Sequence, residues 1–177
     1  MHDMKVYILL LTSILCTLSS KAQESNAIGS IFPHMETESA DSKIVFPDDL
    51  KGKYSIIGLA YSIKSGEKMP DWVVPVYQEF ISGSKDVNAY FVYMFSGVNM
   101  ALKDVVKNKM INEMDPELLP HTVFETGDLK KYQKFLDMLG RKDTPYFFVL
   151  DPEGKILWAT RGTCRVSKID KLASYID

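Results

Sequence analysis

Residues 144–164, TPYFFVLDPEGKILWATRGTC, constrain the fold of this chain more than any other stretch. A Thr-Pro pair precedes an apolar run at 146–150, which predicts a buried strand. Four turn-forming residues at 151–154 lead into a second run at 155–160, and two runs joined in this way predict a β-hairpin. A glycine at 162 ends the segment before a helix that we expect over residues 167–176.

Strands and helices alternate in the preceding part of the chain. Residues 54–61 (YSIIGLAY) are almost continuously apolar, which is typical of a strand covered on both faces. The other expected elements are extended segments within 28–49, a polar loop at 62–69, a helix from Pro70 to Gly83 kinked at Pro75, a strand at 87–95, a helix at 99–114, a short strand at 122–124 and a helix at 128–139. This order predicts one α/β domain in which parallel strands gain an antiparallel edge from the terminal hairpin.

The helix expected at 99–114 is amphipathic. Its apolar positions are Leu102, Val105, Val106 and Met110, which fall on one helical face. We therefore expect this face, together with its methionines, to pack against the core.

The first 22 residues have the pattern of a secretion signal. Lys5 supplies a positive charge, residues 6–18 are apolar, and small residues precede a cleavage point after Ala22. The apolar run is short compared with the roughly 20 residues that span a bilayer. We expect residues 23–27 to form a loose tail and residues 28–177 to form the domain.

The expected location is therefore the periplasm or the extracellular space. An uncleaved N-terminal anchor is an alternative. A lipid attached at Cys16 is another, although the bulky Leu15 before it fits the lipid-attachment pattern poorly.

Charge and cysteine content exclude several classes of protein. The formal net charge is −2, and the basic residues are interleaved with acidic ones, so no nucleic-acid footprint is expected. Removal of the signal leaves Cys164 as the remaining cysteine. An internal disulfide is then impossible, and the core itself must supply the stability of the domain.

The chain resembles the exported type of the thioredoxin-like superfamily over residues 28–177. The resemblance rests on the strand after Leu-x-Gly-Lys at 50–53, on Thr144-Pro145 before a strand, on the Asp-x-x-Gly hairpin, and on the glycine before the last helix. It implies a thioredoxin-like three-layer α/β/α sandwich with a mixed central sheet. It also places Thr144-Pro145 at the family's cis-proline site.

A closer resemblance is to the thioredoxin-like family of mitochondrial ATP synthase assembly factors and its bacterial relatives. GKYSII at 52–57, SIKSGEK at 62–68 and GKILWA at 154–159 are the motifs that are similar. Members of that family act as chaperones in the assembly of a membrane complex. The resemblance thus implies a protein partner, such as a membrane-complex subunit, and no enzymatic activity.

Dithiol oxidoreductases of this fold carry two cysteines at the start of the first helix, and here that Cys-x-x-Cys motif is missing. Ser62 and Ser65 have the corresponding spacing. Serine does not ionise near neutral pH without a strong base, and it cannot form a disulfide. We therefore predict a redox-inactive domain that binds a protein or peptide in a groove lined by Ser62, Ser65, Thr144, Pro145 and Tyr146.

The alternative is a thiol-dependent enzyme, either a thiol-disulfide oxidoreductase or a peroxidase, with Cys164 as its candidate catalytic residue. Arg161 and Arg165 flank this cysteine and would lower its pKa if they lie close to it. A copper site is disfavoured, because both loop thiols are missing and the mature chain keeps just two histidines, His34 and His121. We expect no metal and no small-molecule cofactor.

Overall fold

The computed structural model describes residues 27–40, 42–83, 85–137 and 141–176. The predicted signal peptide at 1–22, including Cys16, and the first four residues of the predicted tail therefore lie outside the described residues. Ala27, the last residue of that tail, is buried in the core. Within the described residues, no helix has the length and apolar character needed to cross a membrane.

The described chain forms a seven-stranded mixed sheet in the order β2-β1-β5-β4-β3-β6-β7. The strands are β1 (Met35–Glu38), β2 (Lys43–Phe46), β3 (Tyr54–Ala60), β4 (Val87–Phe95), β5 (Thr122–Thr126), β6 (Tyr146–Leu150) and β7 (Ile156–Arg161). β3 is parallel to β4, and β4 is parallel to β5, whereas every other pairing is antiparallel. The predicted parallel centre and antiparallel terminal hairpin are confirmed.

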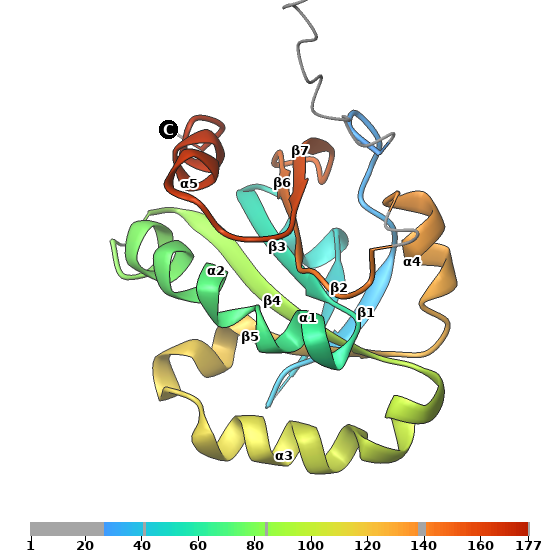
Figure 1. Cartoon of the computed structure of the whole chain (residues 1–177). Coiled ribbons are helices and arrows are strands. Elements are labelled where there is room, and N and C mark those ends of the chain that lie inside the picture. The colour runs from blue at the N-terminus through green and yellow to red at the C-terminus, as the bar shows by residue number, and fades with distance from the viewer. Residues whose placement is uncertain (1–26, 41, 84, 138–140, 177) are drawn as a thin grey trace, which may run out of the picture.

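Helices cover both faces of this sheet, with α2 and α5 on one face and α4 on the other (Figure 1). The helices are α1 (Ile63–Glu67), α2 (Pro70–Val76), α3 (Lys103–Glu113), α4 (Lys130–Phe135) and α5 (Val166–Ala173). A π-helical turn at Tyr77–Ile81 continues α2 just after Pro75, where proline removes one helical N–H. Short 3-10 helices occupy Asp48–Leu50, Gly97–Leu102 and Pro116–His121.

Close packing at the centre of the sheet depends on one glycine. Phe147 of β6 stacks on Trp72 of α2, with ring centroids 4.2 Å apart, and both side chains are fully buried. A Cβ added to Gly58 of β3 would lie 2.6 Å from the Phe147 ring. A larger residue at position 58 would therefore push the ring out of the stack, which explains a glycine inside a buried strand.

The environment of α3 differs from the one expected. The predicted helix forms over Lys103–Glu113, but its apolar residues are not gathered on one face as expected, and no residue of α3 is buried. Its apolar side chains face a groove instead of the core, and Val105 is 67% exposed. Figure 1 shows α3 apart from the two helical layers, below α1 and α2.

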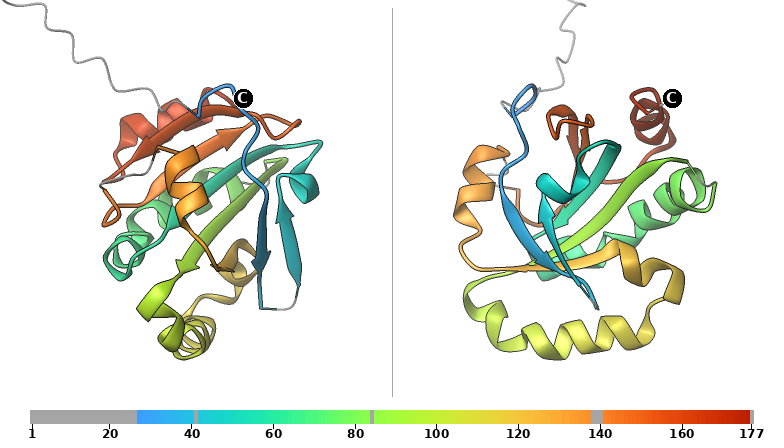
Figure 2. Two further views of the ribbon diagram at one scale, coloured as in Figure 1. Left: turned by 90° about the vertical axis from the view of Figure 1, so that its right-hand side faces the viewer. Right: turned by 180° about the vertical axis from the view of Figure 1, so that it is seen from behind.

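At the two outermost strands of the sheet, some outward-facing backbone groups are hydrogen-bonded to other segments of the chain. At the β2 edge, the N–H of Val45 donates to the Asp49 carboxylate at 2.7 Å. At the β7 edge, the segment 29–32 runs alongside the start of the strand, with Ile156 N–H donating to the Ser30 carbonyl at 2.9 Å. Figure 2 shows the β1–β2 hairpin that extends the sheet on the opposite side from β7.

Candidate functional site

The two serines with the Cys-x-x-Cys spacing form a reciprocal helix cap. Ser62 follows β3 and is the N-cap of α1, so the segment predicted to be a polar loop begins with a short helix. The N–H of Ser65 donates to Ser62 Oγ at 3.1 Å, and the N–H of Ser62 donates to Ser65 Oγ at 2.9 Å. This arrangement is a capping box in which a serine takes the place of the usual Glu or Gln.

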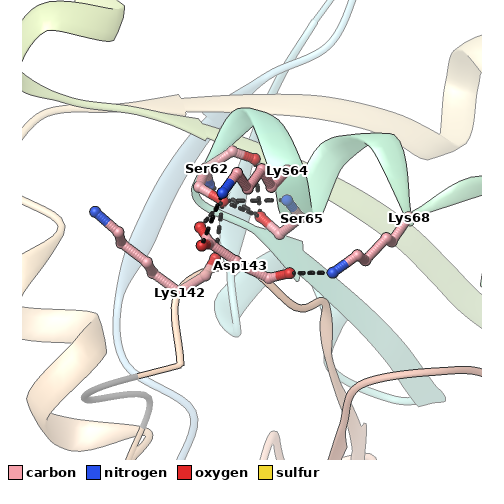
Figure 3. Close-up of polar contacts among 6 residues, drawn as sticks. All are labelled: Ser62, Lys64, Ser65, Lys68, Lys142 and Asp143. Atoms are coloured by element: carbon pink, nitrogen blue, oxygen red, sulfur yellow. Dashed lines mark hydrogen bonds and ion pairs between the residues drawn. The ribbon is translucent and has the colours of Figure 1, made fainter.

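The remaining hydrogen-bonding capacity of both hydroxyls is also used within the protein. Ser65 is fully buried and donates to the Ser62 carbonyl at 2.9 Å. Ser62 Oγ lies 2.9 Å from the Lys142 carbonyl and 3.2 Å from Asp143 Oδ1 (Figure 3). Among the described residues, the side-chain partners of Ser62 Oγ are Ser65 and the Asp143 carboxylate, and they include no imidazole.

The loop before Pro145 is fastened to this serine cap by charged groups as well. Lys68 Nζ donates to the Asp143 carbonyl at 2.9 Å, and Lys64 Nζ lies 3.8 Å from the Asp143 carboxylate. Figure 3 shows the loop lying directly against the start of α1. The serine cap therefore joins two segments about 80 residues apart in the sequence, and its polar groups bond to each other.

The cis bond that the resemblance implies at Thr144-Pro145 is not found. Within the described residues the cis peptide bond is Phe46–Pro47, and the bond between Thr144 and Pro145 is trans. The trans form is the more stable one for an X-Pro bond by about 0.5–1 kcal/mol. The trans chain is also held in place, because the carbonyl of buried Pro145 accepts a hydrogen bond from Gly162 N–H at 3.0 Å.

Tyr146 forms part of the wall behind the serine cap. Its ring lies 6.2 Å from that of Tyr61, and its hydroxyl donates to the Arg141 carbonyl at 3.3 Å. Burial is the main reason why the pKa of Tyr61 is raised well above its ordinary value. The Tyr146 hydroxyl and the Asp143 carboxylate raise it further. Tyr61 is therefore a neutral structural group at physiological pH.

The structure thus brings the five predicted groove residues to one place. Ser65, Pro145 and Tyr146 are buried there, whereas Ser62 and Thr144 are partly exposed. Of the five, Ser62 also lines a hollow between α1, α2 and α3. It has a volume of about 630 Å³ and is lined mainly by apolar side chains.

The hollow between α1, α2 and α3 is an apolar groove that the sequence did not predict. The signal was present in the apolar positions of residues 102–110, which were assigned to the core. An apolar stripe shows that a helix has a preferred face, but it does not show whether that face is covered.

Cys164 lies in the loop between β7 and α5 and is partly buried against the α2–α5 side of the core. Burial raises the pKa of its thiol above the ordinary value, and the Asp71 carboxylate adds to the rise. Lys168 and a backbone hydrogen bond from Arg165 act in the opposite direction without overcoming it, and the expected lowering of the pKa by the side-chain charges of Arg161 and Arg165 is not found. The site consequently holds little thiolate at neutral pH.

The two histidines make contacts within the fold. His121 Nδ1 lies 2.8 Å from the Ala89 carbonyl, and His34 Nε2 lies 3.4 Å from the Glu36 carboxylate. Over the described ranges, no three His, Cys, Asp or Glu side chains come together in a group that could hold a metal ion. The donors that a soft metal would need are therefore not gathered in this part of the chain.

No protein-family model and no curated protein sequence matches this chain. Its backbone is similar to the thioredoxin domain of a thiol-disulfide oxidoreductase from Bacteroides vulgatus, with 17% identity and a TM-score of 0.56 over 85% of this chain and 99% of that one. Copper-bound Sco1 from yeast is similar at 18% identity and a TM-score of 0.51, over 85% and 92% of the two chains. The exposed lipoprotein thioredoxin Etrx1 from Streptococcus pneumoniae is similar at 16% identity and a TM-score of 0.55, over 79% and 100%.

The fold is therefore thioredoxin-like, as the terminal hairpin and the alternating first half predict. At such low identity the similarity establishes architecture alone. What the protein does must be argued from the residues of this chain.

Proposed function

We propose that this protein is an exported thioredoxin-like protein that binds a protein or peptide and does not carry out dithiol exchange. The observation that carries the proposal is the capping box of Ser62 and Ser65. These residues stand at the start of the first helix after β3, where dithiol oxidoreductases of the fold carry their thiols. Both hydroxyls are engaged in capping that helix, and Ser62 Oγ also donates to the Lys142 carbonyl in the loop before Pro145.

The proposed peptide-binding face consists of Ser62, Ser65, Thr144, Pro145 and Tyr146. Ser62 and Thr144 are its partly exposed members, and the three buried residues set its shape. Backbone groups of the residue before the proline are the natural partners for an extended peptide at such a face.

Two narrower proposals concern location and partner. Export to the periplasm or the extracellular space is supported by the signal-like pattern of residues 1–22 and by the exposed lipoprotein among the similar structures. A membrane-complex subunit as partner is supported by the motifs that resemble the ATP synthase assembly factors.

An insulin-reduction assay tests the absence of dithiol chemistry. We expect the protein purified from Gln23 onward to give no dithiothreitol-coupled turnover, because serine cannot cycle through a disulfide. Turnover by the wild-type protein that disappears in Cys164→Ala would contradict the proposal and favour a thiol enzyme.

Affinity capture from solubilised membranes tests the binding role. The wild-type protein should recover a membrane-complex subunit, and a Ser62→Arg/Thr144→Arg variant should recover less of it, because two bulky cations would block the proposed face. Recovery of the same proteins by both forms would remove this face from the proposal, and recovery of no protein partner would refute the binding function.

A further inference from the structure

The groove between α3 and the α1–α2 segment exposes an unusual amount of apolar surface. Its walls include Ile63, Val74, Leu102 and Val105, and these are half of the large apolar residues that are exposed within the described chain. Val105 is 67% exposed and Ile63 is 59% exposed. Apolar side chains gathered in this way mark a surface that another molecule covers.

The chemistry of the groove suits a helix better than an extended peptide. Its floor includes Tyr93 and Phe95 of β4, a strand already paired on both sides with β3 and β5. The floor therefore offers no free strand edge, and an extended segment lying there would leave its own N–H and C=O groups unpaired. A helix satisfies these groups internally and presents side chains alone.

Polar side chains in the groove do not change this conclusion. The Thr122 hydroxyl already donates within the fold, lying 3.0 Å from the Leu118 carbonyl. Ser62 is used in the cap and in the contact with the loop at 142–143. A ligand that needs several hydrogen bonds would find few partners among these lining groups.

The length of the groove indicates the size of its occupant. One wall is α3, whose 11 residues extend for about 16 Å. A partner helix lying along α3 would make about three turns of contact and would place apolar residues at i, i+3 or i+4, and i+7 against the two walls.

The charges at the rim indicate the chemistry of the partner's flanks. Glu67, Glu113 and Asp115 line the groove, and Lys109 is 4.0 Å from Glu113. Among the described residues, Glu67 and Asp115 have no basic side chain within ion-pair distance. An acidic rim repels an anionic lipid or fatty acid and attracts Lys or Arg.

We propose that this groove binds an amphipathic helix of a partner protein, whose apolar stripe lies between α3 and the α1–α2 segment and whose basic flank faces Glu67 and Asp115. The inference rests on the proposed protein-binding function and adds to it a second surface with its own partner chemistry.

The test uses the chain from Gln23 onward, which contains every described residue, and a labelled helical peptide of about 18 residues made of Leu, Ala and Lys. Fluorescence anisotropy should show binding of one peptide per protein. The same peptide with Glu in place of each Lys should bind at least about tenfold more weakly.

Matched variants locate the binding site. Val105→Glu places a charge in the groove and should weaken binding about tenfold or more. Val166→Glu is the control, because Val166 is also an exposed helical valine, lies on α5 and does not line the groove. It should change the affinity by less than about twofold. Glu67→Lys should shift the preference toward the acidic peptide.

Three results would overturn the inference: equal binding of the two peptides, equal effects of Val105→Glu and Val166→Glu, or a dimer that Val105→Glu converts to a monomer. Binding of a long-chain fatty acid in the absence of peptide binding would also overturn it in favour of a lipid. None of these results depends on insulin reduction or on membrane capture through the Ser62–Thr144 face, so the inference can fail while the proposed function stands.

Discussion

Ser65→Ala is the substitution that most directly tests whether the serine pair is a structural cap. At a fully buried position it removes the hydroxyl that accepts from Ser62 N–H at 2.9 Å, donates to the Ser62 carbonyl at 2.9 Å and lies 3.2 Å from Ser62 Oγ. Each such bond contributes about 0.5–1.5 kcal/mol net, so we expect a loss of about 2 kcal/mol in the free energy of unfolding. For a chain of this length that loss lowers Tm by about 4–8 °C.

Urea denaturation followed by circular dichroism measures this loss. Ser174→Ala is the control, because its hydroxyl donates to the Lys171 carbonyl at the exposed end of α5. The control should change the free energy of unfolding by about 0.5 kcal/mol or less. If Ser65→Ala is equally neutral, the cap does not stabilise the start of α1, and the structural interpretation of the serine pair fails.

Three further predictions concern a buried acid, a buried glycine and the free thiol. Burial raises the pKa of Glu125, so its contribution to stability is complete at low pH and is lost as the pH rises through the raised value. Glu125→Gln should therefore raise Tm at pH 7, and this gain should shrink as the pH is lowered toward 4.5; a gain independent of pH would contradict this. Gly58→Ala should cost about 1–3 kcal/mol in urea denaturation by overpacking, and a second change, Phe147→Leu, should restore part of it; no restoration would refute the packing argument. Cys164 should react with iodoacetamide at pH 7 more slowly than glutathione does, because its pKa is raised, and a faster reaction would support the thiol-enzyme alternative.

The strands were the most predictable part of the fold. The apolar runs at 54–61 and 146–150 became β3 and β6 because both faces of the central sheet are covered, and Ser55 is the one polar residue within these two strands. α1 was not predicted. With five residues, this helix is too short to show a helical periodicity in the sequence. Its capping box has serine at the N3 position, so the usual Glu or Gln signal is missing as well.

The contacts around the serine pair were predictable only in part. The sequence showed the spacing of Ser62 and Ser65 and a resemblance around Thr144-Pro145, and the structure places Ser62 against Lys142 and Asp143, just before that pair. The loop before Pro145 is held against the serine pair by contacts of Asp143 with Lys64 and Lys68. These residues are far apart in the sequence, so a local sequence pattern does not predict the contacts. The apolar positions of α3 likewise revealed a face without revealing that an open groove lies beneath it.

The covered outer strands have a consequence for self-association. A sheet whose last strands expose unpaired N–H and C=O groups is a template for further strands, and such edges drive aggregation. Here the Asp49 carboxylate occupies the Val45 N–H at one border, and the segment 29–32 occupies the start of β7 at the other. Another chain would therefore find these backbone positions already occupied if it were to continue the sheet at these two places.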